Sequence, residues 1–158
     1  VDRALLAKGF HIVIAPLTGG NGASKEEWDA TYKFFTDHGF SKKPIMEGSG
    51  AGAAEAYSWA IMNPDKVAGI YVENPAFRSL MSKTQPLDNL APLAEAGISL
   101  ILVSGSLDPW LNSNTRVAEK RYKELGGKVT VMIRKGEGHF LTFKDPVPVV
   151  DLITKSIH

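Results

Sequence analysis

The sequence has 158 residues, of which 44% are hydrophobic and 22% charged, and its formal net charge is +1. This length and composition fit one globular domain over residues 1–158, and the near-zero charge gives no sign of a nucleic-acid or membrane partner. The absence of cysteine excludes disulfide bonds, thiolate metal ligands and cysteine nucleophiles, and it leaves the cellular compartment open. No apolar stretch of the sequence has the length that a bilayer-spanning segment needs.

Apolar runs of strand length alternate with amphipathic segments of helix length along the chain. In chain order, the predicted elements are strand 11–15, helix 25–37, strand 44–48, helix 51–62, strand 67–72, helix 87–96, strand 98–104, helix 113–125, strand 128–133 and helix 147–157. Ser24 is the predicted N-cap of the first of these helices. Segments 16–24 and 74–85 are the predicted irregular loops. Strands rich in Val, Ile and Leu, each followed by a helix, predict an α/β fold: a mostly parallel sheet of about five strands with helices on both faces.

The segment Gly-Ser-Gly-Ala-Gly runs from Gly48 to Gly52, between a predicted strand and a predicted helix. A strand, a tight turn of small residues and a helix form the context of the nucleophile elbow, whose pattern is G-x-S-x-G. Gly48 and Gly52 occupy the positions at which strand and helix approach closely. Gly50 therefore stands where the pattern has its serine. Because glycine tolerates the strained backbone of that position, we expect a positive φ at Gly50.

The stretch GSGAGAAEAYSWAIMNPDKVAGIYVENP, which starts at Gly48, resembles the elbow region of bacterial serine esterases with the α/β-hydrolase fold. Members of that family often read G-x-S-x-G-G there, followed by a tryptophan-containing helix and by N-P-D-K-V. The resemblance extends over nearly the whole chain, but it departs at Gly50, where the family has its serine. It implies about three further strands before residues 11–15. The sequence starts without methionine and without a signal-like leader. We expect the domain either to be incomplete at its N-terminus or to be a reduced version of the fold.

Ser49 is an alternative nucleophile, one residue earlier. That register would place Glu47 and Ala51 at the close-packing positions, and Glu47 is too large for such a position. A side chain at Ser49 should also point away from one at position 50. A glycine-rich turn without catalytic meaning is a further alternative. We retain Gly50 as the nucleophile position.

Two later strand ends carry residues that suit a catalytic triad. Asp108 lies in G-S-L-D-P after predicted strand 98–104, and His139 lies in G-E-G-H after predicted strand 128–133. The order of position 50, Asp108 and His139 matches the order Ser, Asp, His of this fold. The resemblance implies that Asp108 orients the imidazole and that His139 acts as general base and then general acid. A turn aspartate before proline is the plainer alternative for Asp108. The other histidines, which we expect to be structural or solvated, are His11, His38 and His158.

Other residues carry weaker signals. The amide of Ala51, which follows the nucleophile position, is the implied oxyanion-hole donor. Trp110 is a candidate for lining a substrate pocket beside Asp108, although tryptophans more often belong to the core. Glu47 is unexpected in an inner strand, because a buried carboxylate needs partners. No cluster has metal-ligand spacing and no phosphate-binding loop is present, so we expect neither metal nor cofactor.

Two functions of different classes remain open. In the first, the chain is a serine-type carboxylic ester hydrolase without its nucleophile, inactive or nearly so, whose partner is a small-molecule ester. In the second, it is a non-catalytic relative that binds a ligand or partner in the former active-site cleft. A third option keeps His139 as a lone base for proton abstraction or water activation. The joint presence of Asp108 and His139 favours the first function.

Overall fold

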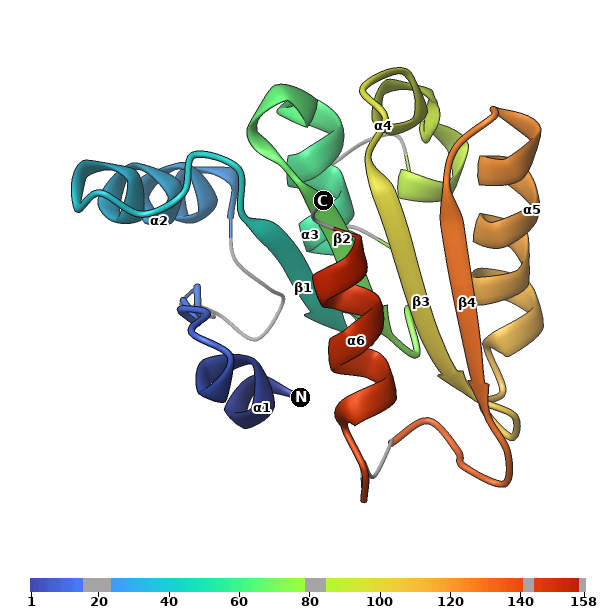
Figure 1. The fold of residues 1–158 in the computed structure, drawn as a ribbon. Helices are drawn as coiled ribbons and strands as arrows, with labels where there is room; N and C mark the ends of the chain where they lie inside the picture. Colours follow the sequence, from blue (N-terminus) through green and yellow to red (C-terminus); the bar gives the residue numbers. More distant parts are fainter. Residues whose placement is uncertain (16–23, 79–84, 141–143, 157–158) are drawn as a thin grey trace.

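The sheet of this protein is parallel and its strands follow one another in chain order. A computed structural model describes residues 1–15, 24–78, 85–140 and 144–156. The sheet has four strands in the order β1-β2-β3-β4. These strands are β1 (Ile45–Ser49), β2 (Gly69–Glu73), β3 (Ser99–Gly105) and β4 (Val129–Arg134). All neighbouring pairs are parallel, so every strand ends at the same edge of the sheet (Figure 1). The expectation of a parallel α/β sheet is confirmed, with one strand fewer than predicted.

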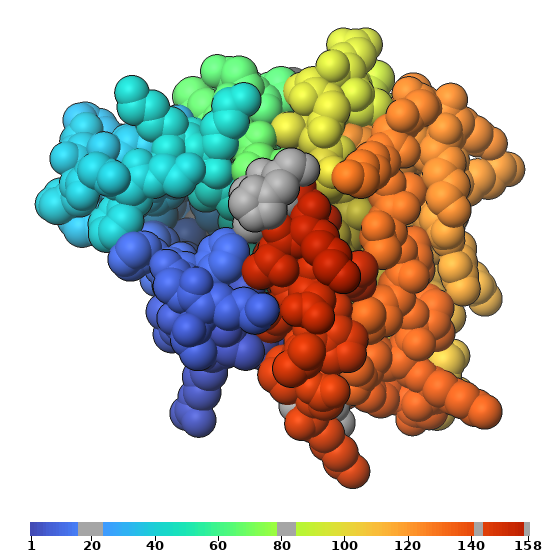
Figure 2. Space-filling view, viewed as in Figure 1, coloured from blue at the N-terminus to red at the C-terminus, as the bar shows by residue number. Residues whose placement is uncertain are grey.

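Helices cover both faces of this sheet. They are α1 (Asp2–Ala7), α2 (Lys25–Asp37), α3 (Gly52–Met62), α4 (Ala91–Glu95), α5 (Arg116–Glu124) and α6 (Val147–Lys155). Helices α3, α4 and α5 pack on one face, and α1 and α6 on the other (Figure 1). In the space-filling view, α6 runs along the middle of the nearer face, with the N-terminal segment beside it (Figure 2). Among the described residues, no helix is both long and apolar enough to cross a membrane.

Alternation along the strands creates these two cores. Leu100 and Leu102 of β3 belong to the core under α3, whereas Ile101 and Val103 belong to the core under α6. Successive side chains of a strand point to opposite faces, so a central strand must be apolar at every position. All seven residues of β3 are buried. The near-continuous apolar run in the sequence has this physical origin.

Local sequence signals set the helix boundaries. Helix α2 has the bounds predicted from the sequence, and the Ser24 side chain accepts the Glu27 amide at 3.2 Å while the Glu27 carboxylate accepts the Ser24 amide at 2.6 Å. This reciprocal capping box defines the helix start. The predicted helix 87–96 is instead a 3-10 turn, Pro86–Asp88, followed by α4, because Pro92 fits only the first turn of a helix. The predicted helix 113–125 begins with a π-helical turn, Leu111–Thr115, before α5.

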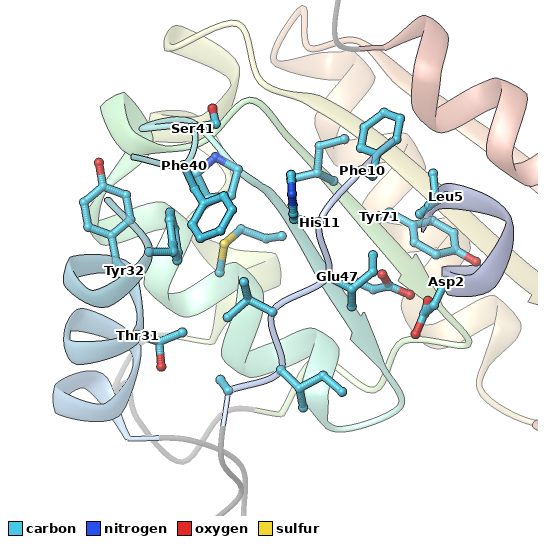
Figure 3. Close-up of a pocket in the computed structure, with 18 of the residues that line it drawn as sticks. Asp2, Leu5, Phe10, His11, Thr31, Tyr32, Phe40, Ser41, Glu47 and Tyr71 are labelled. Carbon is cyan, nitrogen blue, oxygen red and sulfur yellow. The ribbon is translucent and has the colours of Figure 1, made fainter. Parts of the chain in front are cut away.

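The predicted strand 11–15 is wrong. These residues belong to no strand, and Ile14 is 82% exposed. A strand needs a neighbour to complete its ladder, and an apolar cleft of about 560 Å³ lies between this segment, α2 and β1. Figure 3 shows the segment passing beside β1 with side chains projecting into the cleft. The apolar composition of residues 11–15 therefore predicted a buried strand, but the described residues provide no neighbouring strand with which it could pair. Most of the predicted loop 16–24, and residues 79–84 of the loop 74–85, lie outside the described residues.

Candidate functional site

The elbow between β1 and α3 has the backbone that the sequence predicts. Gly50 follows the last residue of β1 and has φ +53°, in the left-handed region. Its amide donates to the carbonyl of Glu73 at 3.0 Å, and its carbonyl accepts the amide of Ala76 at 2.9 Å. The last residue of β2 and the loop after it thus hold Gly50 from both sides through main-chain atoms. Positive φ favours glycine, so the prediction for Gly50 is confirmed.

The two glycines that flank the elbow differ in their steric role. A Cβ at Gly48 would lie 2.7 Å from main-chain atoms of Ala53, so only glycine lets β1 approach α3 there. A Cβ at Gly52 would meet no atom of the described residues within 4 Å. The expected close approach is therefore confirmed at Gly48 and wrong at Gly52. Ser49 ends β1 opposite Glu73, and within the described residues no hydrogen bond joins it to His139.

Asp108 and His139 come together at the strand ends. Nδ1 of His139 lies 3.2 Å from Oδ1 of Asp108, which also accepts the amide of Trp110 at 3.1 Å. The Asp108 side chain is buried. Because a carboxylate oxygen accepts, this contact favours the tautomer of the neutral imidazole that carries its proton on Nδ1 and leaves a lone pair on Nε2. The pair thus has the geometry of an oriented general base.

The other ring nitrogen of His139 faces the elbow. A Cβ built on Gly50 would lie 3.6 Å from Nε2 of His139, and among the described residues no other atom outside the adjoining chain would lie within 4 Å of it. A side chain at position 50 would therefore meet the imidazole. Ala51 stands at the N-cap of α3, where first-turn amides lack helical acceptors, which suits the implied oxyanion donor.

Two aromatic rings flank His139. Trp110 contacts it edge to face with ring centroids 4.6 Å apart, and Phe140 does so at 5.3 Å. Both rings are exposed, Phe140 by 90%. Trp110 was a sequence candidate for pocket lining, whereas no pattern in the sequence singled out Phe140. Their exposed faces offer apolar surface directly beside the imidazole.

Asn74 is a functional candidate that sequence reasoning missed. It follows β2, is 1% exposed and has φ +41°. Its side-chain amide hydrogen-bonds the histidine loop and the end of β3. The sequence signal was an asparagine directly after a strand, since asparagine tolerates the left-handed region better than most residues. Asn114, in the π-helical turn before α5, accepts the amide of Phe77 at 2.9 Å and thereby ties the loop after β2 to that turn.

The remaining histidines lie away from this pair. His38 caps α2 and its Nδ1 lies 2.6 Å from the carbonyl of Phe34. The ring of His11 contacts that of Phe40 at the cleft, with centroids 4.8 Å apart and the planes tilted by 56°. His158 lies outside the described residues. In the described parts of the chain, no three His, Asp or Glu side chains are grouped closely enough to hold a metal ion.

The apolar cleft lies away from this pair, and neither Asp108 nor His139 lines it (Figure 3). Glu47 of β1 projects toward Asp2 at its end. Desolvation, and then the negative charges of Asp2 and Glu73, raise the pKa of Glu47 to about 7. Among the described strands, β1 lies at the edge of the sheet, and solvent still reaches this carboxylate. This exposure accounts for Glu47 on a strand that the sequence predicted to be an inner one.

Comparisons with solved structures bear on the fold. The chain superposes on Arabidopsis thaliana SOBER1 with a TM-score of 0.66 and 16% sequence identity, over 85% of this chain and 63% of that one. It superposes on a carboxylesterase from Mesorhizobium loti with a TM-score of 0.63 and 19% identity, over 82% of this chain and 59% of that one. The chain has an α/β-hydrolase fold. A Bacillus cereus carboxylesterase is similar to it with a TM-score of 0.61 and 17% identity, over 84% of this chain and 59% of that one.

The hydrolase-fold chain spans less than two thirds of each of these three proteins. No protein-family model matches its sequence, and no curated protein matches it significantly. The likeness is thus one of fold, at identities below a fifth. Within this fold, position 50, Asp108 and His139 all follow strands of the sheet at their carboxyl ends, where open α/β sheets bind ligands.

Proposed function

We propose that the site is that of a serine-type carboxylic ester hydrolase in which glycine stands at the nucleophile position. The observation that carries the proposal is the 3.6 Å separation between Nε2 of His139 and the Cβ position of Gly50. A serine hydroxyl attached there would come within hydrogen-bond reach of the imidazole, at about 3 Å. The similarity to carboxylesterases supports the reaction class. As written, the chain has no hydroxyl at position 50 and forms no acyl-enzyme.

With serine at position 50, each remaining group would have a defined part in the reaction. The hydroxyl oxygen would attack the ester carbonyl while Nε2 of His139 takes its proton, and the amide of Ala51 would stabilise the resulting oxyanion. The imidazolium would return the proton to the leaving alcohol, which leaves an acyl-enzyme. Water, deprotonated by the same imidazole, would then attack the acyl-enzyme and release the acid. Asp108 would hold the imidazole tautomer throughout.

The test is Gly50→Ser in the full natural polypeptide, with Gly50→Ala as the matched control. Both substitutions place an L side chain at the same positive φ, so they carry the same backbone strain, on the order of 1–3 kcal/mol. We expect a burst of p-nitrophenol from p-nitrophenyl acetate with the serine variant and none with the alanine variant or the parent. His139→Gln in the serine variant should remove the burst. Loss of the nucleophile alone in a triad costs a factor of roughly 10⁶ in turnover.

Three outcomes would contradict the proposal in different ways. A folded serine variant that stays inert on short-chain and sugar esters would favour the non-catalytic binding protein. Ester hydrolysis by the parent that Ser49→Ala abolishes would identify Ser49 as the nucleophile. Hydrolysis by the parent that requires His139 but shows no burst would identify His139 as a lone base that activates water.

A further inference from the structure

Asn74 occupies a backbone conformation that its sequence context disfavours. It is the one non-glycine residue with positive φ in the described parts of the chain, at +41°, and it precedes Pro75. A residue before proline normally adopts extended backbone, so this conformation carries strain. Strained residues persist only where surrounding contacts fix them. The buried side chain of Asn74 makes such contacts.

Both ends of the Asn74 amide are used. Nδ2 donates to the carbonyl of His139 and to the carbonyl of Gly138, the latter at 3.2 Å. Oδ1 accepts the amide of Gly105 at 2.9 Å. Two acceptors from the histidine loop and one donor from the end of β3 therefore converge on one side chain. Among side chains of this size only a carboxamide can donate and accept in this way.

The loop that carries Asn74 also holds the elbow. Glu73 accepts the amide of Gly50 at 3.0 Å, and Ala76 donates to the carbonyl of Gly50 at 2.9 Å. The segment from Glu73 to Ala76 thus makes two kinds of hydrogen bond. Its main chain bonds position 50, and the side chain of Asn74 bonds the main chain of His139. The distance between the elbow and the imidazole depends on this segment.

We propose that Asn74 is a positioning residue that holds the main chain of His139 so that its imidazole lies between Asp108 and position 50. The catalytic role of this positioning rests on the proposed function. The positioning of the imidazole by Asn74 does not depend on that function. The alternative is a purely structural role, in which Asn74 stabilises the fold while His139 is placed by other contacts. Close packing is one such contact, because a Cβ at Gly105 would lie 2.3 Å from the carbonyl of Glu137.

The first measurement is the tautomer of His139, read from long-range ¹H–¹⁵N NMR spectra at a pH where the ring is neutral. The parent should show the proton on Nδ1, since Asp108 accepts there. Asn74→Asp keeps the shape but sets a carboxylate against two carbonyl oxygens, and Asn74→Gly keeps the positive φ without a side chain. Both variants should lose the Nδ1–H form of His139. The tautomer of His38, which is held by the carbonyl of Phe34, should not change.

The second measurement is turnover of p-nitrophenyl acetate in the Gly50→Ser background. Adding Asn74→Gly should lower kcat by up to about 100-fold, because a displacement of 1 Å at a catalytic group costs that much, with KM changed less than about twofold. Asn89→Asp, at an exposed asparagine after the Pro86–Asp88 turn, is the control and should change neither quantity. If Asn74→Asp fails to fold, Asn74→Gly alone decides.

The inference is overturned if a folded Asn74→Gly variant retains the Nδ1–H tautomer of His139. It is equally overturned if the parent shows the proton on Nε2, or if His38 changes together with His139, since that pattern reports general loosening of the fold. An inert Gly50→Ser variant would count against the proposed function, whereas the tautomer result would still decide the role of Asn74.

Discussion

The side chain of Glu47 should make the free energy of unfolding depend on pH. Its carboxylate lies beside Asp2 and near Glu73, at the end of the apolar cleft. Desolvation and these two negative charges favour the protonated form and raise its pKa to about 7, from a usual value of 4.5. Between these values the folded protein binds more protons than the unfolded chain. The free energy of unfolding should therefore fall as the pH rises from about 4.5 to about 7.

Glu47→Gln should remove this contribution. Because solvent reaches the carboxylate, we expect the effect to be screened to about 1 kcal/mol. The difference in unfolding free energy between pH 5 and pH 8, from urea titrations, should shrink by that amount in the variant. Glu95→Gln, at an exposed position at the end of α4, is the matched control and should leave the difference unchanged. An identical pH dependence in the parent and Glu47→Gln would show that the carboxylate is fully hydrated.

At the scale of elements, the contact between β1 and α3 fixes the elbow. Gly48 lies against the main chain of Ala53, whereas no atom of the described part of the chain would lie within 4 Å of a Cβ at Gly52. Main-chain atoms cannot move aside as flexible side chains do. A methyl group at Gly48 therefore forces the strand and the helix apart, and this displaces the turn that carries Gly50.

Gly48→Ala should destabilise the protein by about 1–3 kcal/mol, the usual cost of overpacking. Gly52→Ala, at the first residue of α3, should be neutral or stabilising by up to about 1 kcal/mol, because alanine loses less chain entropy in a helix. Thermal unfolding of the two variants measures the contrast. Equal stability of both would mean that β1 and α3 are not in the close contact described. In the Gly50→Ser background, only Gly48→Ala should also reduce turnover.

The sequence predicted elements well where a local cause determines them. The capping residue Ser24 located α2, and the apolar run of β3 located the central strand. It failed where the cause is distant in the chain. Residues 11–15 have the composition of a strand, but a strand also needs an adjoining edge, and composition carries no information about that edge.

The candidate site divides in the same way. Gly50, Asp108 and His139 could be predicted because each follows a strand in a recognisable loop. Asn74 could not, because its bonds reach residues 64 and 65 positions away, and no periodicity reports such contacts. Phe140 could not either, since an exposed aromatic ring acquires meaning only from its neighbour His139.

At the scale of the whole molecule, the sheet has a hydrophobic core on each face, and fewer helices cover one face than the other. Three helices pack on one face, whereas the other face is covered by α6 and the short α1 (Figure 1). Each apolar side chain of α6 therefore contributes a large share of that second core. Val150 of α6 is 1% exposed, and Val147 of the same helix is 54% exposed.

Val150→Ala should lower the unfolding free energy by about 2 kcal/mol, from two lost methyl groups at about 0.8 kcal/mol each plus a residual cavity. Val147→Ala should change it by less than about 0.5 kcal/mol, as surface substitutions do. Chemical denaturation with a common slope measures both. A small effect of Val150→Ala would mean that α6 is dispensable to the fold.

The hydrogen bonds that hold position 50 to the loop after β2 run through main-chain atoms of Glu73 and Ala76. A side chain at position 50 takes no part in these hydrogen bonds. The main chain around position 50 is therefore held in the same way whichever side chain is placed there. Hydroxyl, thiol and carboxylate groups placed there would each meet the same imidazole at the same strain in the main chain. Position 50 is therefore a fixed main-chain site at which nucleophilic side chains of different chemistry can be compared in the same surroundings.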